Sequence, residues 1–151
     1  KLIDQDPGSI LMEMNGRSLG SRLLAPTRIY VDAVLKLTQI YEISAISHIT
    51  GGGFYENIPR ILNNDSKANI NFNEKEWPTH ELFDWIKSKG NIQKEEMLST
   101  FNCGIGMVLA LKEGDVNGAR GLLSRLDIVS KVIGKVEPKK SEDENIEIKF
   151  N

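Results

Sequence analysis

Three consecutive glycines, Gly51–Gly53, constrain the fold of this chain more than any other feature of its sequence. They follow an alternating apolar run, Ile43–Ile49, which predicts a short strand, and they precede Ile58–Leu62, which predicts a short helical turn. Because glycine has no Cβ atom and adopts positive φ readily, the triplet allows a sharp reversal whose N–H groups can face an anion at a helix start. The triplet therefore predicts either an ordinary turn or a phosphate-binding loop.

Spacing alone does not decide between these two interpretations. No Gly-Lys-Ser/Thr follows the triplet, as a Walker A loop requires, and the spacing does not match the Gly-x-Gly-x-x-Gly of dinucleotide-binding folds. Polar side chains do flank the glycines: the imidazole of His48, the hydroxyl of Thr50 and the carboxamide of Asn57. A single histidine is more often a packed residue than a catalyst, so both interpretations stay open.

Composition excludes several classes of function. The 151 residues suffice for one domain, and 19 basic against 21 acidic side chains predict no general affinity for nucleic acid or an anionic membrane. The apolar runs are too short to span a bilayer, and residues 1–7 lack the apolar core of a secretory signal, so we expect a cytoplasmic protein. Cys103 is the single cysteine; we predict a small core residue there, and no metal site.

The order of the expected elements predicts an α+β domain with layers of helices on a mixed sheet, rather than a Rossmann or barrel fold. Gly104–Leu111 carries apolar residues on both faces, which predicts the central strand. Trp77 and Trp85 are expected to be core or interface anchors. The other expected strands are Lys67–Phe72, Ile128–Glu137 and Asn145–Phe150, with a weak strand at residues 10–14, and the expected helices are Arg17–Leu24, Thr27–Tyr41, Thr79–Lys89, Gln93–Ser99 and Asp115–Leu126.

Two further places carry candidate ligand-binding residues. Thr27 and Arg28 fall at the predicted N-terminus of the helix Thr27–Tyr41, where free N–H groups and a guanidinium can hold a phosphate. The alternative there is a capping threonine beside a solvated arginine. Asn102 stands at the mouth of the strand Gly104–Leu111, where its amide can orient a neutral polar substrate.

Three stretches together resemble one family. HITGGGFYENIPR at residues 48–60, LAPTRIYV at 24–31 and TFNCGIGMV at 100–108 occur in the order and spacing of aminoimidazole ribonucleotide synthetase, also called phosphoribosylformylglycinamidine cyclo-ligase. The resemblance covers about residues 15–150 and implies the C-terminal domain of that enzyme over 15–151, without its ATP-binding N-terminal half. Residues 1–14 depart from the family pattern, since Glu13 and Met14 stand where His and Ser are expected, so we expect a divergent or remnant segment there.

The resemblance implies an ATP-dependent ring closure that converts formylglycinamidine ribonucleotide into aminoimidazole ribonucleotide, ADP and phosphate in purine biosynthesis. It implies that ATP and Mg²⁺ are held mainly by the N-terminal half, that the full-length enzyme is a homodimer, and that this piece alone is inactive. Carried over by position, His48 and Asn102 become candidate catalytic residues. The candidate substrate- or phosphate-binding residues are Thr27, Arg28, Thr50, Gly51, Gly52, Gly53 and Asn57.

Two alternatives remain at this point. The chain can be a non-catalytic binding or assembly domain that keeps the fold without holding ATP. It can also belong to another enzyme of the same superfamily, such as thiamine-monophosphate kinase or selenophosphate synthetase, although we would not expect those to carry all three stretches.

Overall fold

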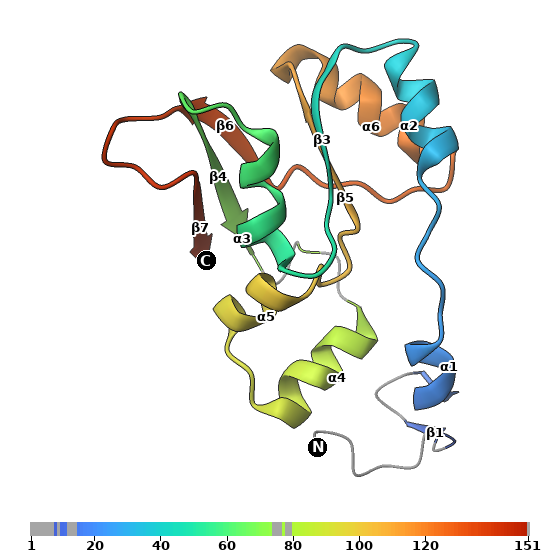
Figure 1. Ribbon diagram of the computed structural model, residues 1–151. Coiled ribbons are helices and arrows are strands. Elements are labelled where there is room, and N and C mark those ends of the chain that lie inside the picture. Colours follow the sequence, from blue (N-terminus) through green and yellow to red (C-terminus); the bar gives the residue numbers. More distant parts are fainter. Residues whose placement is uncertain (1–7, 9, 12–14, 74–76, 78–79, 151) are drawn as a thin grey trace.

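The computed structural model describes residues 8, 10–11, 15–73, 77 and 80–150, and its elements form an α+β domain (Figure 1). The predicted fold class is therefore confirmed. The strands are β1 Ile10–Leu11, β2 Arg17–Ser18, β3 Ile43–His48, β4 Ser66–Phe72, β5 Met107–Leu111, β6 Gly134–Pro138 and β7 Ile146–Phe150. The helices are α1 Leu19–Leu23, α2 Val31–Thr38, α3 Gly53–Asn57, α4 Glu81–Gly90, α5 Lys94–Thr100 and α6 Val116–Arg125, with 3-10 turns η2 Pro59–Ile61 and η3 Glu113–Asp115.

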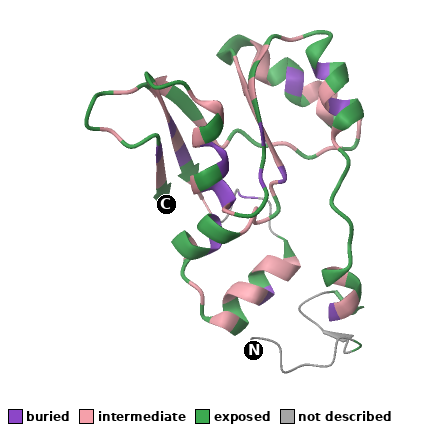
Figure 2. Cartoon of the chain, viewed as in Figure 1, coloured by how far each residue is buried: buried purple, intermediate pink, exposed green. Residues whose placement is uncertain are grey.

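The main core lies against a mixed three-stranded sheet in which β4 is central. β6 pairs with one edge of β4 in antiparallel orientation, and β7 pairs with the other edge in parallel orientation. The alternation predicted for this strand places Ala68 and Ile70 on the buried face, and Ile146 lies beside Ala68. Phe54 of α3 packs onto the same cluster, and Figure 2 shows these buried segments facing one another.

β3 and β5 form a separate antiparallel ribbon, beside which α2 and α6 lie together (Figure 1). The prediction that Gly104–Leu111 is the central strand is wrong. β5 begins only at Met107, its one strand partner in the described part of the chain is β3, and each of its residues is half-buried. Both faces of β5 carry apolar side chains because neighbouring elements partly bury each face. A sequence pattern cannot distinguish a strand that is partly buried in this way from a central strand.

Several predicted boundaries move for identifiable reasons. The helix expected at Thr27–Tyr41 spans only Val31–Thr38, and the residues that follow Pro26 up to Tyr30 have no regular secondary structure. Downstream of that proline, Arg28 is held by a non-local contact with the carbonyl of Asp127. The strand expected at Ile128–Glu137 begins only at Gly134. The helix α4 includes Gly90, which we expect to end it, and is capped instead by Asn91 in left-handed conformation. Residues 12–14 and 79, included in two predicted elements, lie outside the described residues.

Both tryptophans are core anchors, as predicted. Trp77 is 8% exposed and packs against Phe54 and Phe72, with ring centroids 5.4 and 4.7 Å away. Trp85 is 5% exposed and packs against Leu19, which joins α1 to α4. No helix in the described part of the chain has the length and apolar character needed to cross a membrane.

We expect Ile70→Ala to lower the free energy of unfolding by about 2–4 kcal/mol, because it leaves a cavity at a position that is 4% exposed. The matched control is Ile29→Ala, which removes the same atoms where the side chain is 84% exposed and should cost less than about 0.5 kcal/mol. Urea unfolding followed by tryptophan fluorescence measures both. Equal losses in the two variants would contradict this assignment of the core.

Candidate functional site

The glycine triplet forms the turn between β3 and α3. Gly52 has φ 87° and caps α3, and Gly53 has φ 54° as its first residue, so the chain reverses through two left-handed positions. The amide of Gly53 donates a hydrogen bond of 3.1 Å to the carbonyl of Thr50. The predicted turn is confirmed, and the helical turn predicted at Ile58–Leu62 is present as η2, but the helix α3 that begins within the triplet was not predicted.

The three glycines of the triplet differ in whether the structure has room for a side chain. Gly53 is buried, and a Cβ atom there would overlap the carbonyl oxygen of Leu98, so the absence of a side chain lets α3 approach the backbone of α5. At Gly52 a Cβ atom would overlap the carboxylate of Glu56, whereas at Gly51 it would meet no atom within 4 Å. Since the Gly53 amide already bonds within the turn, Thr50, Gly51 and Gly52 are the positions left to face a ligand.

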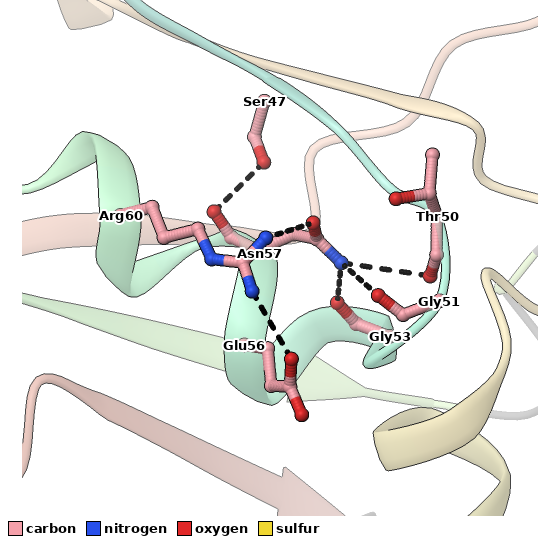
Figure 3. Close-up of polar contacts among 7 residues, drawn as sticks. All are labelled: Ser47, Thr50, Gly51, Gly53, Glu56, Asn57 and Arg60. Carbon is pink, nitrogen blue, oxygen red and sulfur yellow. Dashed lines mark hydrogen bonds and ion pairs between the residues drawn. The ribbon is translucent and has the colours of Figure 1, made fainter.

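Asn57 holds the loop together (Figure 3). Its side chain is buried, and Nδ2 lies 2.7 Å from the carbonyl oxygen of Gly53, 3.2 Å from that of Gly51 and 3.5 Å from that of Thr50. Its Oδ1 accepts a hydrogen bond of 3.3 Å from Arg60. Because the donors of the amide are directed at loop carbonyls, Asn57 positions the loop. Direct contact of Asn57 with substrate stays a prediction.

Two further contacts fix α3 next to the loop. The buried hydroxyl of Ser47 donates to the carbonyl of Asn57 at 3.0 Å, which ties the end of β3 to the end of α3. The guanidinium of Arg60 also pairs with Glu56 at 3.1 Å on the exposed side (Figure 3). A surface pair of this kind contributes little stability, but it keeps a carboxylate beside Gly52.

His48 is exposed at the end of β3 and meets residues from the other two stretches. Its ring lies edge-on to that of Tyr30, with centroids 6.2 Å apart, and the Tyr30 hydroxyl occupies the space where a side chain at residue 106 would project. The amide of Ile49 donates to the Gly106 carbonyl at 2.9 Å. Tyr30 and Gly106 were not singled out in the sequence, although both lie in the stretches LAPTRIYV and TFNCGIGMV.

Thr27 and Arg28 do not stand at a helix N-terminus, so the predicted helix start is wrong, whereas their contact with a phosphate stays a prediction. They lie in an exposed segment without regular secondary structure before α2, whose N-cap is Tyr30. The Arg28 guanidinium donates to the carbonyl of Asp127 at 3.1 Å and so joins this segment to the end of α6. Helix periodicity predicted a helix start here because it cannot register the non-local contact that Arg28 makes with Asp127.

Asn102 begins the turn that leads into β5. Its Oδ1 accepts from the amide of Gly104 at 3.1 Å, and its carbonyl accepts from Ile105 at 2.8 Å. Cys103 and Gly104 both have positive φ within this turn. Asn102 is thus a turn-forming residue close to Gly106, and its contact with a ligand stays a prediction.

Cys103 has the character of a core residue rather than a nucleophile. Its thiol lies 3.5 Å from the Met97 carbonyl and packs against the main core. Burial, reinforced by the negative charge of Asp84, raises the pKa of the Cys103 thiol to about 11. The thiol is therefore protonated at neutral pH, as expected for a structural cysteine.

Residues 4–146 match the model of a known family, described as AIR synthase related protein, C-terminal domain. The chain belongs to this family. The AIR synthase related C-terminal domain is shared by several ATP-dependent enzymes, so the match establishes the class of protein and leaves its specific reaction open.

Enzymes that contain an AIR synthase related C-terminal domain generally use ATP and Mg²⁺. Among the described residues, no three His, Cys, Asp or Glu side chains converge in a way that could hold a metal ion. Magnesium prefers carboxylate, phosphate and water oxygens in octahedral geometry. The described residues therefore do not fit a resident Mg²⁺, whereas Thr50 and the open backbone at Gly51 could donate to an oxygen of a phosphate.

We expect Gly53→Ala to lower the free energy of unfolding by more than about 2 kcal/mol, because it adds left-handed strain and a clash with the Leu98 carbonyl. The matched control is Gly51→Ala, two residues away in the same loop, which should change stability by less than about 0.5 kcal/mol. Thermal unfolding followed by circular dichroism compares the two. A stable Gly53→Ala variant would show that α3 and α5 do not pack this closely.

Asn57→Ala should destabilise the domain by about 1–3 kcal/mol, because it leaves the buried carbonyl of Gly53 and the part-buried carbonyl of Gly51 without their donor. Asn63→Ala is the control, since exposed Asn63 makes a single local bond to the amide of Asp65. Guanidinium unfolding gives the difference, and the amide protons of residues 50–54 should exchange faster in Asn57→Ala. Unchanged exchange rates at residues 50–54 would show that Asn57 does not position the loop.

At pH 8 we expect Cys103 to react with iodoacetamide roughly two orders of magnitude more slowly than an exposed cysteine of pKa about 8.5, because its pKa is about 11. The rate should rise about tenfold per pH unit up to pH 10. The same chain in urea is the control, because its one thiol is then exposed. A rate that levels off below pH 9 in the folded chain would contradict the raised pKa.

Proposed function

We propose that this chain is the C-terminal half of aminoimidazole ribonucleotide synthetase, which closes the imidazole ring of formylglycinamidine ribonucleotide at the expense of ATP. The observation that supports this most directly is the meeting of His48, Tyr30 and Gly106, one residue from each of the three stretches quoted above. Tyr30 and Gly106 lie 76 positions apart in the chain, yet the Tyr30 side chain lies against both exposed His48 and buried Gly106. Their side-by-side placement favours a shared site over independent turns.

Ring closure requires that the substrate be oriented and that its protons move at defined atoms. Bound ATP supplies the phosphoryl group that turns the formamide oxygen into a leaving group. On this chain, the exposed imidazole of His48 is suited to accept or donate a proton, and Tyr30 orients that ring. The hydroxyl of Thr50 and the backbone at Gly51 and Gly52 can bind phosphate oxygens, while Asn57 acts through the loop.

The hydrogen bonds of Asn57 also determine which groups of the loop can face a phosphate. The carbonyl oxygens of Thr50, Gly51 and Gly53 turn toward the amide of Asn57 (Figure 3). Carbonyls held in this way are kept from facing an incoming anion, which would be repelled by them. The N–H side of the loop at Gly51, together with the Thr50 hydroxyl, can then lie toward a phosphate group.

The deciding experiment joins this chain to an ATP-binding N-terminal half and measures ATP-dependent ring closure. We expect His48→Asn to lower kcat by about 10²–10⁴-fold, the range for loss of a general acid or base. His80→Asn alters the other histidine of the chain, at the start of α4, and should change kcat less than about twofold. Full activity of His48→Asn would show that His48 takes no part in the reaction. If the unaltered protein catalyses no ring closure, the proposed substrate is wrong.

A second candidate function is a non-catalytic binding or assembly domain, and one observation favours it. The carboxylate of Glu56 lies over Gly52, where its negative charge opposes the approach of a phosphate. Titration of the joined protein with formylglycinamidine ribonucleotide, followed by calorimetry, separates the candidates. Binding that strengthens in Glu56→Gln favours the cyclo-ligase, whereas no binding in either protein favours the non-catalytic domain.

A further inference from the structure

The outer side of α2 exposes apolar side chains that the fold leaves uncovered. Ala33 and Leu37, one turn apart, form the buried side of this helix. Val31 and Leu35, also one turn apart, lie on the opposite side and are 60% and 56% exposed. Ile29, two residues before the helix, is exposed as well. Ile29, Val31 and Leu35 are called the α2 patch below.

The segment that follows α6 adds to the apolar surface beside the α2 patch. The Arg28 guanidinium donates to the Asp127 carbonyl, which brings the chain before α2 next to the chain after α6. Val129 comes two residues after this contact and is also exposed. Single exposed apolar side chains are normal, but several on adjoining segments are typical of a surface that binds another protein.

Two opposite charges flank the α2 patch. Asp32 and Lys36 are one turn apart on α2, both are exposed, and they lie on the side of the helix next to Val31 and Leu35. Within the described part of the chain, no ion pair joins them to each other or to a third side chain. The flank therefore carries an unpaired negative charge near the start of the helix and an unpaired positive charge near its end.

A second copy of α2 can cover the patch and pair both charges. When two identical helices pack antiparallel about a two-fold axis, each flank meets the same flank of its partner in reverse order. Val31 of one copy then lies near Leu35 of the other, and Asp32 lies near Lys36. In a parallel pair the charged flank would face the uncharged flank that holds Thr38. The helix is thus complementary to itself in the antiparallel orientation.

We propose that two copies of this chain form a dimer in which their α2 helices pack antiparallel through the α2 patch, with Asp32 of each copy paired to Lys36 of the other. The apolar patch supplies most of the affinity, and the charges select the orientation. The interface uses this chain alone, so it does not depend on ring closure. It adjoins the candidate site, because Tyr30, the N-cap of α2, contacts His48.

Sedimentation equilibrium of the 151-residue chain tests the apolar part of the interface. We expect a monomer–dimer equilibrium, and Leu35→Asp should weaken it at least about tenfold, because the interface would bury a charge without a partner. Val136→Asp is the matched control: Val136 is a similarly exposed apolar residue on β6, in another part of the fold (Figure 1), and its replacement should leave association unchanged. A chain that stays monomeric at every concentration, or equal effects of the two variants, would overturn the proposal.

Charge reversal tests the orientation of the two helices. Asp32→Lys leaves two positive charges on the flank and Lys36→Asp leaves two negative charges, so each variant alone should associate at least about fivefold more weakly at low salt. An equimolar mixture of the two variants should form heterodimers about as tightly as the unaltered chain, and added salt should weaken them. If the mixture associates no better than either variant alone, the antiparallel pairing is wrong. This comparison also decides if Leu35→Asp does not fold, because both charged positions are exposed.

Discussion

The close approach of α3 to α5 at Gly53 is the constraint on which the rest of this structure depends. With no side chain at residue 53, the first turn of α3 rests on the Leu98 carbonyl, and Phe54 then enters the core over β4. One turn later, the side-chain amide of Asn57 donates hydrogen bonds to the loop carbonyls of Gly51 and Gly53. The loop, the helix α3 and the core are therefore packed together, and a substitution in one of them strains the packing of the others.

This arrangement separates residues that shape the site from residues that face outward. Gly53 and Asn57 are buried and serve packing and polar satisfaction, whereas His48, Thr50 and Gly51 are exposed beside them. A rigid inner layer with a polar outer layer is what a binding loop needs, because a ligand then meets groups that are already in place.

Local chemistry alone determined the α+β class, the turn at the glycine triplet and the inward face of β4, because the order of elements, missing Cβ atoms and alternation are properties of neighbours in sequence. Only the tertiary structure decided that β4 rather than β5 is central, that Thr27 and Arg28 precede a helix instead of starting one, and that Tyr30 and Gly106 meet His48. Each of these depends on contacts between residues far apart in the chain. No periodicity within a single segment encodes which distant segment will cover it.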